Sequence, residues 1–150
     1  PYKVGFRRIE IIDKVIHLNG KRLIITGVNR HEWSAKTGRV IGIKEMISDI
    51  QCMTRNNINS VRTCHYPDQI PWYYMCDEAG IYVMAETNLE SHGSWQKLGA
   101  IEPSWNVPGS VLQWREAVVD RARNNFETFK NHTSILFWSL RNESYAGDDI

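Results

Sequence analysis

Ile135-Leu136-Phe137-Trp138-Ser139-Leu140 is a short run near the carboxyl end of the chain that is apolar except for one serine, and polar residues follow it directly. Such a run is typical of a strand that is buried on both faces, as in a parallel sheet. Three earlier stretches, 22–28, 58–64 and 81–85, are rich in β-branched and aromatic residues. We predict all four stretches as strands.

Helical patterns separate these strands. Apolar residues recur at helical spacing over 43–57, over 68–79 and over 110–129. Asp68 and Ser110 are the expected N-caps of the second and third helices, and Gly80 is the expected C-cap of the second. Strands that alternate with helices imply right-handed crossovers and a parallel sheet, either doubly wound or a (β/α)8 barrel. The predicted fold class is therefore α/β, and the absence of a glycine-rich phosphate loop weakens its nucleotide-binding version.

The amino-terminal segment has a different pattern. Residues 6–12 alternate and then become apolar, and Asn19-Gly20 is a strong signal for a two-residue hairpin turn. The chain begins with Pro1 and shows neither an initiator Met nor the apolar region of a signal peptide. We expect a hairpin here, in a chain that is part of a longer protein.

Composition excludes several classes of partner. Among 150 residues, 18 Lys and Arg stand against 17 Asp and Glu, so no strong field attracts nucleic acid. The apolar runs are far shorter than the roughly 20 residues that cross a bilayer, which argues against a membrane partner. Three cysteines without a C-x-x-C spacing predict free thiols in a reducing compartment, the cytoplasm. The long irregular stretch 88–109 is predicted to be a functional loop.

Polar side chains follow every predicted strand of the sheet. In chain order they are His31, His65, Glu90 with His92, and Asn142 with Glu143. In a β/α barrel the carboxyl ends of the strands converge on one face, which carries the active site. Arg30 and Arg62 lie on the same strands, and we interpret them as candidates for ion pairs of the barrel wall.

The chemistry of the carboxylates favours glycoside cleavage. That reaction needs one carboxylic acid to protonate the leaving oxygen and, in retaining enzymes, a second carboxylate about 5 Å away. Glu143 is the best placed acid, because a buried strand end is expected to leave its carboxyl poorly solvated and so favour the protonated form. Asn142 beside it can hydrogen-bond a sugar hydroxyl.

Four motifs carry a family resemblance: Gly27-Val28-Asn29-Arg30-His31-Glu32, Val61-Arg62-Thr63-Cys64-His65-Tyr66-Pro67, Glu86-Thr87-Asn88-Leu89-Glu90-Ser91-His92-Gly93 and Trp138-Ser139-Leu140-Arg141-Asn142-Glu143-Ser144. In order and spacing they resemble the catalytic barrel of the family 2 bacterial β-galactosidases, and the likeness covers nearly the whole chain. It implies the first half of a TIM (β/α)8 barrel, about four βα units, over residues 21–150. Residues 1–20 then form a lead-in hairpin from a preceding β-sandwich domain.

The resemblance also implies roles for individual residues. Glu143 matches the acid/base of the family, and Asn142 matches the neighbour that bonds the sugar 2-hydroxyl. Glu90, His92 and Glu143 match ligands of Mg²⁺, the implied cofactor, and a Na⁺ site in the intact enzyme is left open. His31 and His65 match histidines that contact the galactose and stabilise the transition state. The implied activity is hydrolysis of terminal β-D-galactosides such as lactose with retention.

Two departures from the family qualify this expectation. The family usually has Gly before the Asn-Glu pair, whereas this chain has Arg141, whose long side chain could crowd the strand exit. The chain also ends before strands five to eight, where the family keeps its nucleophilic Glu. The segment alone is therefore expected to be inactive. If it proved active alone, Glu86 or Glu90 would have to be reconsidered as the second carboxylate.

A half-barrel has unpaired strand edges, so we expect an oligomer in which the segment binds the remaining half of the barrel or another copy of the chain. Two other functions stay open. One is a mononuclear metal-dependent hydrolase built on His31, His65, Glu90 and His92. The other is a non-catalytic sugar-binding or complementing subunit.

Overall fold

The amino-terminal part of the chain forms a small antiparallel sheet. A computed structural model describes residues 3–91 and 112–144. The sheet contains β1 (Ile9–Ile12), β2 (Val15–Leu18) and β3 (Lys21–Arg22), in the order β1-β2-β3. Asn19 and Gly20 have positive φ between β2 and β3, which confirms the predicted hairpin turn. A second turn at Asp13 and Lys14, also with positive φ, was not predicted.

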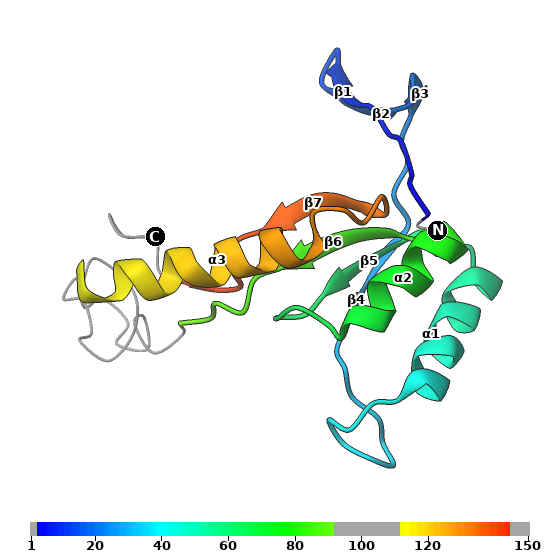
Figure 1. Cartoon of the computed structure of the whole chain (residues 1–150). Helices are drawn as coiled ribbons and strands as arrows, with labels where there is room; N and C mark the ends of the chain where they lie inside the picture. The colour runs from blue at the N-terminus through cyan, green and yellow to red at the C-terminus, as the bar shows by residue number, and fades with distance from the viewer. Residues whose placement is uncertain (1–2, 92–111, 145–150) are drawn as a thin grey trace.

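The predicted strand 22–28 is wrong as one continuous strand. The structure ends β3 at Arg22 and begins β4 (Gly27–Arg30) after an irregular connection. Asn59 holds this connection in place, because its side-chain Nδ2 donates to the Ile24 carbonyl at 2.8 Å and its Oδ1 accepts from the Thr26 N–H at 2.8 Å. The small sheet consequently lies away from the rest of the fold (Figure 1).

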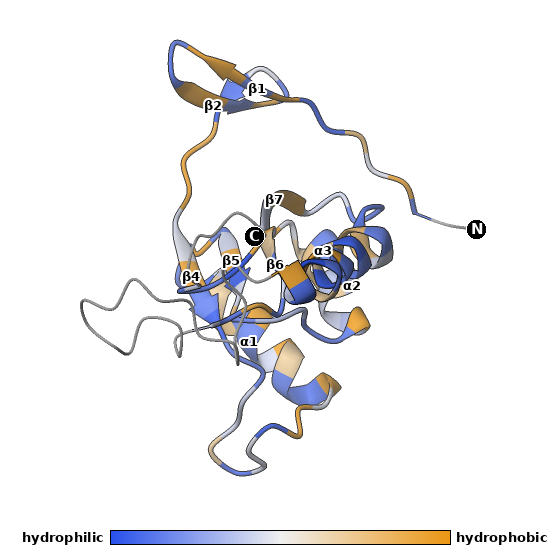
Figure 2. Ribbon diagram, turned by 90° about the vertical axis from the view of Figure 1, so that its left-hand side faces the viewer, coloured by the Kyte–Doolittle hydropathy of each residue, from blue (hydrophilic) through white to orange (hydrophobic). Residues whose placement is uncertain are grey.

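The main body is a four-stranded parallel sheet in the order β4-β5-β6-β7. Its further strands are β5 (Ser60–Thr63), β6 (Tyr82–Glu86) and β7 (Ile135–Ser139). The helices are α1 (Ile43–Arg55), α2 (Ile70–Ala79) and α3 (Arg115–Phe129), the last preceded by the 3-10 helix η2 (Leu112–Trp114). Right-handed crossovers between consecutive strands place the helices on one side of the sheet (Figure 2). The predicted α/β fold with about four βα units is confirmed.

The ends of α2 show which sequence signals were correct. Gly80 adopts the left-handed conformation with φ 69° and ends the helix, as predicted. The N-cap is Gln69 rather than Asp68. Asp68 is buried instead and accepts a hydrogen bond from Arg30, so its carboxylate serves an ion pair and not the helix terminus. Ser110, the expected cap of the third helix, lies outside the described residues.

The core lies between the sheet and the helices. Its buried members include Met46 and Met53 of α1, Trp72 and Tyr73 of α2, and Val61, Val83 and Ile135 of the strands. The Phe129 ring at the end of α3 stacks on the Tyr73 ring with centroids 3.9 Å apart. These contacts fix the helices against the sheet and so fix the positions of the strand ends. In the part of the chain that the structure describes, no helix has the length and apolar character needed to cross a bilayer.

Candidate active site

The structure brings the predicted polar residues to one edge of the parallel sheet. His31 follows β4, His65 follows shortly after β5, Glu90 follows β6, and Asn142 with Glu143 follows β7. The strands are parallel and in register, with Glu86 of β6 opposite Ser139 of β7, so their carboxyl ends coincide. This is the edge at which α/β proteins place their active sites.

At the centre of this edge lies Glu86, whose side chain is fully buried. Its two carboxylate oxygens accept hydrogen bonds from Arg62 Nε at 2.6 Å and from Arg62 Nη2 at 2.9 Å. Ser139 Oγ donates to the same carboxylate at 2.7 Å, and His65 Nδ1 lies 2.8 Å from it. A buried charge needs partners of this kind to offset its desolvation. Hydrogen bonding to Glu86 accordingly raises the pKa of Arg62.

Asn142 connects this cluster to the exit of β6. Its Oδ1 accepts a hydrogen bond from Arg62 Nη2 at 2.9 Å, and its Nδ2 donates to Glu90 Oε1 at 2.8 Å. The backbones of Glu90 and Asn142 also form an isolated parallel bridge. The side-chain amide is therefore held in one orientation between an arginine and a carboxylate.

Glu143 differs from its expected environment. Its φ is 37°, in the left-handed region that non-glycine residues seldom adopt. The residue is exposed to solvent, so the expectation of a poorly solvated carboxyl is wrong for this chain. β7 ends at Ser139, so Glu143 lies four residues beyond the end of the strand.

The two histidines lie next to each other. The rings of His31 and His65 meet edge to face with centroids 5.2 Å apart. His31 Nδ1 also lies 3.4 Å from the hydroxyl of Tyr66. Imidazole rings at a strand exit offer both donors and acceptors to a polyhydroxyl ligand. The two rings therefore lie close together at the carboxyl ends of β4 and β5.

A second buried ion pair supports the loop that carries His31. Arg30 donates to Asp49 at 2.9 Å and to Asp68 at 2.8 Å, and its guanidinium lies 3.7 Å above the ring of Trp72. These contacts join the end of β4 to α1 and to the start of α2. Burial raises the pKa of Asp68 to about 7 in spite of the arginine. The interpretation of Arg30 and Arg62 as ion-pair residues agrees with these contacts.

Two of the three expected Mg²⁺ ligands, Glu90 and Glu143, lie among the described residues. The isolated backbone bridge joins Glu90 to Asn142, the residue before Glu143. Two carboxylates therefore follow adjacent strands, and carboxylates are ligands that Mg²⁺ prefers. Within 3–91 and 112–144, no group of three His, Cys, Asp or Glu side chains is arranged to hold a metal ion. His92, the third expected ligand, lies outside the described residues, as does most of the 88–109 loop.

Sequence reasoning missed the importance of Glu86. It appeared there only as the first residue of a strand exit and as an alternative second carboxylate. A signal was available, because Glu86 ends the apolar stretch Tyr82–Ala85 and a parallel strand is buried on both faces. A carboxylate at that position needs cationic partners, and Arg62 on the adjacent strand was the available one.

Comparisons with known proteins place the chain in a family. Residues 9–150 match the family described as glycosyl hydrolases family 2, TIM barrel domain. The beta-galactosidase large subunit of Lactobacillus acidophilus is 74% identical over the whole chain, which covers 24% of that protein. The beta-galactosidase of Halalkalibacterium halodurans is 57% identical, again over the whole chain, which covers 15% of it.

Solved structures agree with the sequence comparison. A crystal structure of Ruminococcus gnavus beta-glucuronidase superposes with a TM-score of 0.82 at 27% identity, covering 95% of this chain and 23% of that one. The chain thus spans a quarter or less of the length of these relatives. On the family match over nearly its whole length, the chain belongs to the family 2 glycosyl hydrolases and forms part of their TIM barrel domain.

Proposed function

We propose that this chain is the acid/base-bearing half of the barrel of a retaining β-galactosidase that hydrolyses terminal β-D-galactosides such as lactose. The observation that carries the proposal is the arrangement of Asn142 and Glu143 after β7, tied to Glu90 after β6 by the 2.8 Å hydrogen bond of Asn142. Relatives named beta-galactosidase at 57 to 74% identity support the choice of galactoside.

Each residue then has a role that its position allows. Glu143 protonates the leaving oxygen and later activates water, and its exposure leaves it accessible to a substrate and to solvent. Asn142 has one amide hydrogen directed to Glu90, and its second can bond the sugar 2-hydroxyl. His31 and His65 contact the galactose ring from the neighbouring strand exits.

Glu90, Glu143 and His92 are the residues that would hold Mg²⁺. A bound divalent cation would supply a fixed positive charge beside the acid/base. Glu90 also accepts the hydrogen bond from Asn142 Nδ2, so a proposed metal ligand is joined directly to the proposed sugar-binding residue.

The segment does not contain a residue that matches the family's nucleophilic Glu, and Glu86 cannot serve in its place because it is fully buried and saturated with hydrogen bonds. No covalent glycosyl-enzyme can form without a nucleophile. The segment alone is then inactive, and it acts with the remaining strands of the barrel. The name large subunit, given to its Lactobacillus relatives, suggests a further partner subunit. The three free cysteines support a cytoplasmic location for the enzyme, which we propose with the function.

A segment exchange tests this proposal. The matching residues of the Lactobacillus acidophilus large subunit are replaced by this chain, and the chimera is co-expressed with its partner subunit. We expect magnesium-dependent hydrolysis of a chromogenic β-galactoside by the chimera and none by the 150-residue chain alone.

Two outcomes would contradict the proposal. A folded chimera that binds galactose but does not turn over would favour a non-catalytic sugar-binding subunit. Turnover by the chain alone would show that a second carboxylate lies within it. The chromogenic β-glucuronide is the matched control substrate, since the solved relatives include a beta-glucuronidase, and we expect it not to be hydrolysed.

A further inference from the structure

Glu86 is a buried carboxylate that the proposed reaction does not use. It is fully buried, and its carboxylate has four hydrogen-bonding contacts, two with Arg62, one with Ser139 and one with His65. These partners belong to β5, to the segment after it and to β7. The Glu86 side chain therefore joins three segments at the carboxyl ends of the parallel strands. It cannot touch a substrate itself, which leaves an action through its partners.

The contact with His65 sets which ring nitrogen carries hydrogen. His65 Nδ1 lies 2.8 Å from Glu86 Oε1 and 3.4 Å from Arg62 Nη2. A carboxylate oxygen paired with arginine can only accept, so the shorter contact requires a hydrogen on Nδ1. Nε2 is then the nitrogen available to a ligand, and it is an acceptor when the ring is neutral.

The contact with Arg62 reaches the other side of the site. Arg62 uses Nε and Nη2 on Glu86, and the same Nη2 donates to Asn142 Oδ1 at 2.9 Å. That bond fixes which end of the Asn142 amide is the oxygen, so Nδ2 faces Glu90. Without the Glu86 carboxylate, the Arg62 guanidinium would lose the partner that sets its plane. The Asn142 amide would then lose the donor that fixes its orientation.

We propose that Glu86 is the positioning residue of this site: it fixes the tautomer and ring orientation of His65 and, through Arg62, the amide orientation of Asn142. The inference rests on the proposed function, because it assigns Glu86 to the same sugar contacts. Both the charge and the length of the side chain matter. A carboxamide would present an N–H group to donors of Arg62, His65 or Ser139, whereas a shorter carboxylate would keep the acceptors.

Kinetics of the chimera provide the first test. Glu86→Gln should lower kcat about 100-fold, as expected when groups that contact the reacting sugar are misplaced, with a much smaller change in KM. Glu86→Asp should recover part of the lost kcat. The matched control is Asp77→Asn on α2, which changes another largely buried carboxylate that contacts a histidine, His132, and has no contact with His65 or Asn142. It should lower the melting temperature and leave kcat and KM unchanged.

The kinetic outcomes separate the two ideas. If the parent chimera is active and Glu86→Gln retains its kcat, or if Asp77→Asn loses as much kcat as Glu86→Gln at the same loss of melting temperature, the positioning role is wrong and the proposed function stands. If the parent chimera does not turn over, the proposed function fails, and the second measurement decides the role of Glu86.

That second measurement is the tautomer of His65 in the full chain labelled with 15N-histidine. Long-range proton–nitrogen correlation spectra distinguish a ring protonated on Nδ1 from one protonated on Nε2, and the spectrum of His65→Gln identifies the signals. We expect an Nδ1–H ring at His65 in the parent and in Asp77→Asn, and loss of that tautomer in Glu86→Gln. An Nε2–H ring in the parent, or an unchanged ring in Glu86→Gln, would overturn the inference.

Discussion

Asp68 is expected to make the folded chain less stable as the pH rises, the reverse of the usual effect of a carboxylate. Burial raises its pKa from 3.8 to about 7, and Arg30 opposes the rise without cancelling it. Asp68 Oδ1 is buried without a hydrogen-bond partner, which is consistent with a proton held there. Between these two pH values the folded chain holds a proton that the unfolded chain has released.

The sign and size of the effect follow from this difference. A carboxyl whose pKa is raised by folding stabilises the folded state fully below the unfolded pKa, and this contribution is lost as the pH rises to the folded pKa. At 1.36 kcal/mol for each pKa unit, the rise of the Asp68 pKa from 3.8 to about 7 corresponds to a loss of about 4 kcal/mol of unfolding free energy. The unfolding free energy should therefore fall by up to this amount between pH 4 and pH 7, relative to a chain without the group.

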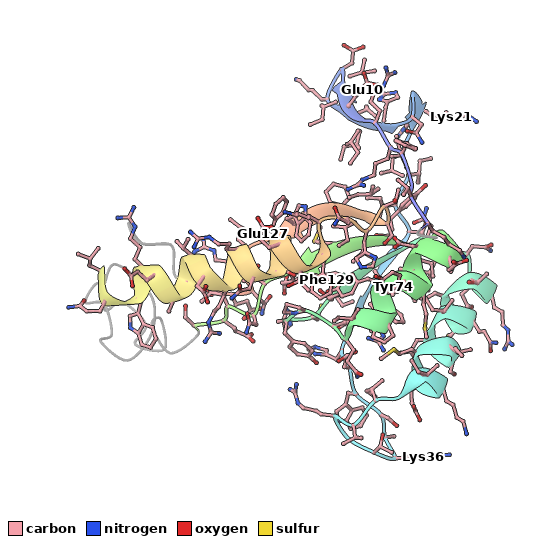
Figure 3. The ribbon with its side chains drawn as sticks, in the orientation of Figure 1. Glu10, Lys21, Lys36, Tyr74, Glu127 and Phe129 are labelled. Carbon is pink, nitrogen blue, oxygen red and sulfur yellow. The ribbon has the colours of Figure 1, made fainter. Side chains whose placement is uncertain are left out.

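The assay is urea unfolding of the full chain and of Asp68→Asn across this pH range. We expect the variant to gain stability relative to the parent as the pH rises. Glu127 is an exposed carboxylate on α3 (Figure 3), and Glu127→Gln should leave the pH slope of the parent unchanged. A constant difference between parent and Asp68→Asn from pH 4 to pH 7 would refute the reasoning.

Four further changes are expected to have measurable effects. Met46→Ala should lower the unfolding free energy in urea by about 2 to 5 kcal/mol, because Met46 is fully buried in the core. Asn59→Ala should cost about 1 to 3 kcal/mol in the same assay, because the Ile24 carbonyl and the Thr26 N–H would lose their partner. Gly80→Ala should cost about 1 to 2 kcal/mol, since φ is 69° there, and an equal or higher melting temperature would contradict this. If Arg141 crowds the strand exit as the sequence predicts, Arg141→Gly in the chimera should raise kcat for the chromogenic galactoside; an unchanged or lower kcat would show that Arg141 does not interfere.

Local patterns were enough to predict most of the fold. The apolar run at 135–140, the helical spacing over 43–57 and the turn at Asn19-Gly20 each depend on residues close in sequence, and the structure confirms the corresponding elements. The strand over 22–28 was wrong because its break depends on Asn59, a residue more than thirty positions away. The same is true of Asp68, whose carboxylate pairs with the distant Arg30 of β4 and does not cap the helix.

The location of the candidate site could be predicted from the sequence, but its hydrogen bonds and ion pairs could not. That His31, His65, Glu90 and Asn142 lie at one edge follows from the alternation of strands and helices. The central place of Glu86 follows only from the register of three strands. The exposure of Glu143 depends on where β7 ends, and element boundaries are what sequence patterns locate least well.

The central claim is that Glu143 is the acid/base of a galactoside-cleaving site, and the chimera tests it most directly with two substrates. The measurement is kcat/KM of the parent chimera and of Glu143→Gln on lactose and on an aryl galactoside whose leaving group is a weak base. A leaving group of that kind needs little protonation. We therefore predict that Glu143→Gln loses far more activity on lactose than on the aryl galactoside. Equal losses on both substrates, or no loss on lactose, would contradict the account.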